Sequence, residues 1–196
     1  MKRKLLTFAV LGAAMVTANA QDNGTDNHKV NVMIPQIALL DIEYTGGSKD
    51  IVLSVAAPTE AGEGIVLTGA TNNSLWLNYT SIVDKGVGSL NATRKVSVKI
   101  SNGVVPGGLD LKVASSAASS DGKGTKGTPA GSALTLSSTD QDIITAIGSA
   151  WTGNGGGKGH QLTYSLAESN SGNDFNLLDN DLDNTQLTIT YTISEN

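Results

Sequence analysis

Residues 187–194 read Leu-Thr-Ile-Thr-Tyr-Thr-Ile-Ser, and this stretch decides the fold class. Its odd-numbered positions are apolar, whereas the even-numbered positions from Thr188 to Ser194 carry hydroxyl groups. In an extended chain, successive side chains point to opposite faces, so this alternation places all the apolar groups on one side. Because β-branched and aromatic residues also favour strands, the stretch predicts a β-strand with one buried and one solvent-facing side.

The same period of two recurs along most of the chain, between turns rich in Gly, Asn, Asp and Ser such as Gly46-Gly47 and Gly107-Gly108. We therefore expect an all-β domain over residues 28–196, an antiparallel immunoglobulin-like β-sandwich of about eight to ten strands. The alternating segments are Val30–Ile34, Leu75–Tyr79, Val96–Ile100, Leu109–Val113 and Leu162–Leu166, and shorter apolar runs lie at Ile37–Leu40, Ile51–Leu53, Ile65–Leu67 and Leu134–Leu136.

Three segments depart from this alternation. Ile143, Ile144 and Ile147 have helical spacing within residues 140–147, which predicts at most one short helix. Residues 114–132 are almost all Ala, Ser, Gly, Thr and Lys, and residues 152–160 are rich in Gly. Long stretches of such composition are typical of flexible loops, so we expect both to be mobile or functional.

The first twenty residues are typical of a cleavable secretory signal peptide. Three basic residues precede an apolar run from Leu5 to Val16, and Ala18-Asn19-Ala20 is a small-x-small cleavage signal. We expect cleavage after Ala20, which would leave residues 21–27 as a polar arm before the sandwich. No second long apolar run follows, so no membrane span is expected. The predicted location is secreted or at the cell surface, with the periplasm as transit or alternative.

The composition narrows the possible chemistry. The chain has no cysteine, which removes thiol catalysis, thiolate metal sites and disulfides. Its formal net charge is −5, and loss of the basic residues of the signal peptide would make it more acidic. An acidic chain with scattered positive charges is a poor partner for nucleic acid. Because the chain has no cysteine to form disulfides, packing and hydrogen bonds within the sheet must hold the fold together.

Two motifs invite a ligand. Residues 122–127 match the glycine pattern of a dinucleotide-binding loop, but the required strand and helix on either side are missing, so that interpretation fails. Asp179, Asp181 and Asp183 resemble the start of an EF-hand loop and could give oxygen ligands to calcium. The glycine at the sixth position is absent and a strand follows. The alternative, an acidic solvated turn, is favoured, and calcium stays the only cofactor considered.

No set of residues satisfies the tests for a catalytic site. The two histidines, His28 and His160, are isolated, so a nucleophile, base and orienting acid cannot be assembled from them. Trp151 lies beside the glycine-rich segment 152–160, which His160 ends. These two residues are the candidate ligand contacts. A hydrolase remains a minor alternative that would require Trp151, His160 and two acids to converge on one pocket.

Four segments carry a resemblance to a known group: Ile144–Gly153 (ITAIGSAWTG), Gly159–Leu166 (GHQLTYSL), Ser74–Tyr79 (SLWLNY) and the strand at 187–193. The chain resembles secreted bacterial β-sandwich surface subunits, namely the fimbrial, spore-coat-U-type and WxL-type proteins. The resemblance covers about a third of the chain, which lacks a cysteine pair. It implies an immunoglobulin-like sandwich used as an extracellular subunit, and it transfers no catalytic residue.

These observations favour a non-enzymatic structural or adhesive subunit that acts through strand pairing. Residues 28–36 and 186–194 are both strand-like, and an open sheet edge would accept a donated strand. The partners would be other subunits, including copies of this chain, or a surface ligand. In the simpler alternative, both segments pair with neighbours inside one closed sandwich. A secreted module that binds a glycan or protein, with or without calcium, is the second hypothesis.

Overall fold

The structure is a computed structural model that describes residues 24–67, 69–86, 93–169, 174–179 and 185–196. It divides into two units, residues 1–34 and residues 35–196. Residues 24–34 contain neither helix nor strand. Val30, Val32 and Ile34 are 71%, 80% and 71% exposed. The strand expected at 30–34 is therefore wrong for the chain alone, because a period-two apolar face forms a strand only where an edge pairs with it.

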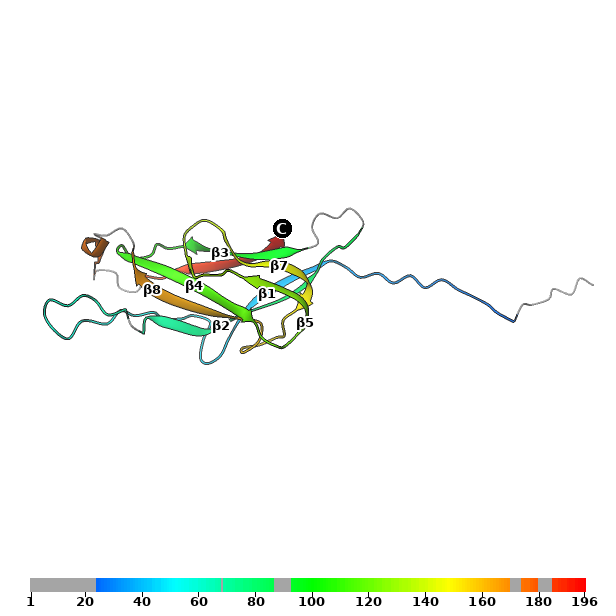
Figure 1. Ribbon diagram of the computed structural model, residues 1–196, viewed down its shortest axis with the longest axis horizontal. Helices are drawn as coiled ribbons and strands as arrows, with labels where there is room; N and C mark the ends of the chain where they lie inside the picture. The colour runs from blue at the N-terminus through cyan, green and yellow to red at the C-terminus, as the bar shows by residue number, and fades with distance from the viewer. Residues whose placement is uncertain (1–23, 68, 87–92, 170–173, 180–184) are drawn as a thin grey trace, which may run out of the picture. The chain divides into compact units, whose positions relative to one another are not determined.

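The unit of residues 35–196 is all-β in its described part, with no α-helix and one 3-10 turn, η1 (Figure 1). In this part of the chain, no helix is long and apolar enough to cross a membrane. The elements are β1 (Ile37–Tyr44), β2 (Thr71–Ile82), β3 (Arg94–Asn102), β4 (Leu109–Ala118), β5 (Lys123–Pro129), β6 (Leu134–Thr135), β7 (Gln141–Trp151), β8 (His160–Glu168), η1 (Asp174–Leu177) and β9 (Thr188–Glu195).

The strands form one antiparallel sheet of nine strands in the order β6-β4-β8-β2-β7-β3-β9, with β1 added to β2 and β5 added to β7. Strand β2 joins the group β6-β4-β8 to the group β7-β3-β9, because Leu75–Leu77 pair with β8 whereas Thr80 and Ser81 pair with β7. Strands β8 and β9 are far apart in this order, yet the hydroxyls of Tyr164 and Tyr191 lie 2.7 Å apart. The sheet therefore folds over on itself into a β-sandwich.

Inward-facing residues of β2, β3, β4, β7 and β8 build the core between the layers. The most buried apolar side chains, each at 0% exposure, are Leu77, Val96, Val98, Val113, Ile143, Ile144, Ile147 and Leu162. The alternating segments at 75–79, 96–100, 109–113, 162–166 and 187–193 are confirmed as strands, and the runs at 37–40 and 134–136 contribute β1 and β6. The runs at 51–53 and 65–67 form no strand, only an isolated bridge from Ala56 to Val66.

The expected helix at 140–147 is wrong, because these residues belong to β7. The ladder with β3 shifts register on both sides of Val96, and Ala146 has a left-handed φ of 56°. Such irregularities insert an extra residue and reset which side chains face inward. Ile143, Ile144 and Ile147 all become buried, so a bulged strand reproduces the spacing of a helix.

The expected flexible loop at 114–132 is also wrong. Strand β4 continues to Ala118, and β5 pairs with β7 from Lys123 to Pro129. Gly124 has a φ of +91°, and a Cβ there would overlap the carbonyl oxygen of Ser149. The low-complexity composition therefore reflects close approach of two backbones, which only small residues permit.

Candidate functional site

The candidate site is a pair of unpaired strand edges on β1 and β9. Strand β9 pairs with β3 from Glu195 opposite Arg94 to Thr188 opposite Asn102, and it ends the sheet order. Strand β1 pairs with β2 over its whole length. Among the described residues, no strand pairs with the second edge of either. Each edge therefore presents main-chain donors and acceptors that another strand can use.

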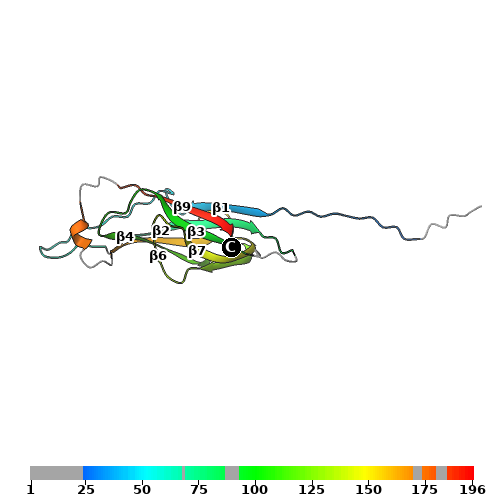
Figure 2. The ribbon, with the colours of Figure 1, turned by 90° about the horizontal axis from the view of Figure 1, so that it is seen from above.

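Arg94 brings these two strands together at one end. It is only 5% exposed, and its Nη1 donates a hydrogen bond to the carbonyl oxygen of Ile37, the first residue of β1. Its Nη2 lies 3.9 Å from Oε1 of Glu195, the last residue of β9. The two strands lie next to each other in Figure 2. The start of β1 and the end of β9 are thus held on one guanidinium group.

The inward side of these edges is apolar and incompletely covered. Leu40 and Ile42 on β1, and Ile189, Tyr191 and Ile193 on β9, are only partly buried against the core. Strand β9 carries no lysine, arginine or proline, the residues that commonly protect an exposed edge from pairing. The seam between β1 and β9 therefore combines unpaired main-chain groups with apolar side chains.

The hydroxyl of Tyr191 is joined across the core to that of Tyr164, at 2.7 Å. Burial raises the pKa of Tyr164 to about 12, and burial together with Tyr164 raises the pKa of Tyr191 well above its ordinary value. Both phenols are therefore neutral at physiological pH, and each satisfies the other. Tyr191 thus anchors β9 to the opposite layer while its edge stays unpaired.

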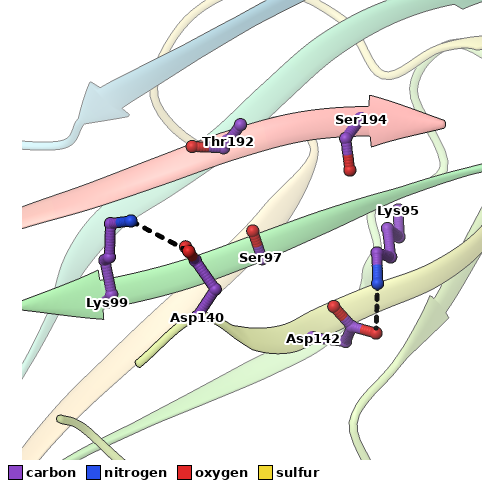
Figure 3. Close-up of a pocket in the computed structure, with 7 residues that line it drawn as sticks. All are labelled: Lys95, Ser97, Lys99, Asp140, Asp142, Thr192 and Ser194. Atoms are coloured by element: carbon purple, nitrogen blue, oxygen red, sulfur yellow. Dashed lines mark hydrogen bonds and ion pairs between the residues drawn. The ribbon is translucent and has the colours of Figure 1, made fainter. Parts of the chain in front are cut away.

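The outer face of β3, β7 and β9 holds a polar pocket of about 400 Å³ (Figure 3). Lys95 lies 3.0 Å from Asp142, and Lys99 lies 2.8 Å from Asp140. Hydroxyls complete the lining, from Ser97, Thr192 and Ser194. Because each lysine is paired with a carboxylate, this face is suited to solvent or to polar contacts.

His160 is buried at 0% exposure, so its expected role as a ligand contact is wrong. Its Nδ1 lies 2.9 Å from the carbonyl oxygen of Ser116. Its Nε2 lies 2.9 Å from the hydroxyl of Tyr79 and 3.1 Å from the carbonyl oxygen of Lys126. Burial lowers the pKa of His160. This histidine fastens β8 to β2, β4 and β5, a role that an isolated histidine in the sequence gives no means of recognising.

Trp151, the other expected ligand contact, is 50% exposed at the end of β7, where it pairs with Thr80 of β2 and Lys123 of β5. Trp151 lies at the surface and His160 in the core, so the structure does not bring them to one pocket. The convergence that the hydrolase alternative requires is not met by these two residues.

The calcium hypothesis rests on residues that are mostly not described. Asp181 and Asp183 lie outside the described residues, whereas Asp179 is exposed. Within the described ranges, no group of three or more His, Asp or Glu side chains could hold a metal ion. Calcium binding at this segment stays a prediction. No protein-family model, curated protein or solved structure matches the chain.

Proposed function

We propose that this chain is an exported, non-enzymatic structural subunit that assembles by strand addition. In this proposal, residues 28–36 of one copy add to the open edge of β9 in a second copy. The observation that carries it is the unpaired, apolar and unprotected edge of β9 beside the unpaired edge of β1. Strand addition uses main-chain hydrogen bonds for affinity and alternate side chains for specificity.

The donor segment has the pattern that such an edge requires. Val30, Val32 and Ile34 share one face of an extended chain and are largely exposed. Burying an apolar side chain of this size contributes about 1.5–3 kcal/mol. Burial of all three side chains would therefore strongly favour pairing with another strand. Residues 24–34 form no strand within their own unit.

Chain length favours a second copy as the acceptor. Antiparallel pairing, the more stable arrangement, would place Ile34 at the Thr188 end of β9. In the same copy, Pro35 and Gln36 would then have to return to Ile37, which lies at the Glu195 end. The three Cα–Cα steps from Ile34 to Ile37 span at most about 11 Å, whereas β9 is more than 20 Å long at about 3.3 Å per residue. An antiparallel arm must therefore come from another molecule.

The test uses residues 21–196, the expected mature chain, and its Val32→Asp variant. We expect the parent to form oligomers in size-exclusion chromatography with light scattering, and Val32→Asp to be monomeric and folded. Adding a synthetic peptide of residues 28–36 should raise the melting temperature of the variant. Val52→Asp is the matched control, because Val52 is 85% exposed and lies outside any strand, and it should assemble like the parent. A monomeric parent that ignores the peptide contradicts the proposal.

A further inference from the structure

A second, smaller cavity lies on the outer face of the sandwich where residues 153 and 154 meet β1 and β2. Its volume is about 180 Å³. Its lining includes an apolar side chain, a carboxylate, two amides and a hydroxyl, from Leu39, Asp41, Asn78, Asn154 and Thr80. The polar pocket of Figure 3 lacks this mixture, because apart from hydroxyls its lining is two paired lysine–aspartate bridges.

The glycine-rich segment forms a fixed wall of this cavity. Asn78 is 4% exposed, and its Nδ2 donates a hydrogen bond of 3.0 Å to the carbonyl oxygen of Gly155. A Cβ on Gly156 would overlap the carbonyl oxygen of Tyr44, and one on Gly159 would overlap that of Leu77. The glycines therefore let this segment lie directly on β1 and β2. The sequence suggested a flexible loop here, but the contacts describe a built surface.

An exposed aromatic ring stands beside the cavity. Trp151 is directly opposite Thr80 in the β2–β7 ladder, and Leu39 is directly opposite Thr80 on its other side. Directly opposed residues have Cβ atoms about 4.5–5.5 Å apart and project from the same face. Trp151 is 50% exposed and Leu39 is 65% exposed. The row from Leu39 to Trp151 thus presents two apolar side chains flanking a hydroxyl.

We propose that this cavity and Trp151 form a binding site for one pyranose ring of a neutral saccharide. A pyranose has an apolar face of C–H groups, which packs on an indole ring, and a rim of hydroxyls. Asp41 accepts hydrogen bonds from such hydroxyls, and the Asn154 amide both donates and accepts. The volume suits a single ring, because cavities for drug-sized ligands measure about 300–1,000 Å³.

The charge at the cavity points to a neutral ligand. The Lys49 ammonium, with its Nζ 3.0 Å from Asp41, holds the pKa of that carboxyl below its usual range. Asp41 is therefore ionised, and its charge is balanced by that of Lys49, so this ion pair offers a phosphate or a uronic acid no net positive charge to bind. This inference does not depend on strand addition, since none of its residues belongs to the arm or to β9.

The test is a titration of ¹⁵N-labelled residues 21–196 carrying Val32→Asp, followed by NMR. The probes are methyl α-glucoside, methyl α-mannoside, methyl β-galactoside and N-acetylglucosamine. With at least one of them, we expect shifts of the Trp151 indole N–H and the Asn154 amide, with a dissociation constant of about 1 mM. Trp151→Ala should weaken binding at least tenfold. Phe175→Ala, which removes an aromatic side chain that is 57% exposed elsewhere, should leave it unchanged.

Two outcomes overturn the inference. One is that no resonance near Trp151 moves with any of the four saccharides at 50 mM. The other is that Trp151→Ala leaves the shift of the Asn154 amide and its saccharide dependence intact, which would show that Trp151 takes no part in binding. Shifts of the Trp151 and Asn154 resonances caused by the arm peptide of residues 28–36, and by no saccharide, would assign the cavity to a protein ligand. Every protein sample in this titration carries Val32→Asp and is expected to be monomeric. A failure to bind any saccharide is therefore distinct from a failure of assembly.

Discussion

Replacing Gly124 with alanine tests whether the low-complexity segment is an ordered strand. Gly124 lies in β5 opposite Ala150 of β7, with a φ of +91°. An added Cβ would overlap the carbonyl oxygen of Ser149 and lie 2.8 Å from the Cα of Ala150. Both obstacles are backbone atoms of a central strand, so a side-chain rotation cannot relieve the clash. Strand β5 must move away from β7.

The expected cost follows from two contributions. An L-residue in the left-handed region costs about 1–2 kcal/mol. Moving β5 outward breaks at least one main-chain hydrogen bond and leaves its partners poorly satisfied, which costs a further 1–3 kcal/mol or so. We therefore expect Gly124→Ala to lower the free energy of unfolding by about 2–5 kcal/mol. Domains are typically stable by about 5–15 kcal/mol, so the loss is large but measurable.

The assay is urea denaturation followed by circular dichroism, with two matched controls. Gly62 has a φ of +94° but nothing within 4 Å of its ideal Cβ, so Gly62→Ala should cost only the backbone strain, about 1–2 kcal/mol. Gly131 has neither feature, and Gly131→Ala should stay within about 0.5 kcal/mol of the parent. If Gly124→Ala costs no more than Gly62→Ala, β5 is not held against β7 and the reasoning fails.

Three further predictions concern the core. Burial lowers the pKa of His160, so the unfolded chain takes up a proton first as pH falls below about 6.5, and stability should decline from there down to the native pKa. When the urea midpoint is measured at pH 7 and at pH 5, it should therefore fall less for His160→Gln than for the parent. Equal falls in the midpoint would contradict this. Tyr191→Phe leaves the buried Tyr164 hydroxyl without its 2.7 Å partner and should lower the free energy of unfolding by about 1–3 kcal/mol. The double variant with Tyr164→Phe should lose less stability than the sum of the two single losses. A fully additive loss would show that the two hydroxyls are not coupled. Ile147→Ala, at 0% exposure, should cost about 2–5 kcal/mol in thermal or urea unfolding, and Val104→Ala, at 79% exposure, should be near neutral; similar costs would place Ile147 outside the core.

The sequence pattern predicts strands well where one face is buried and the ladder is regular. Strands β3 and β9 are examples, because Val96, Val98 and Ile100 face the core and Thr188, Thr190 and Thr192 alternate with apolar residues. The pattern fails where the ladder is irregular. In β7, bulges bury Ile143 and Ile144 in succession, and the period of two disappears.

The candidate site is only partly readable from the sequence. The alternation at Val30–Ile34 predicts a strand, but whether it pairs inside the chain depends on which edges are open, and that is a property of the whole sheet. Arg94 gives no local signal, because its partners Ile37 and Glu195 are remote in sequence. Trp151 could be selected beside the glycine-rich segment, whereas the cavity near it arises from contacts of that segment with β1 and β2.

The contact of Arg94 with both Ile37 and Glu195 has a mechanical meaning for an assembly joined through the arm. If copies join as proposed, tension would enter each subunit at Ile37, directly after the arm, and would leave through β9. The guanidinium ties Ile37 to the Glu195 end of β9, and with an antiparallel arm the load would then run along β9 towards Thr188. The eight residue pairs between β1 and β2 are pulled along the strand axis, so they share the load in shear and do not open one after another.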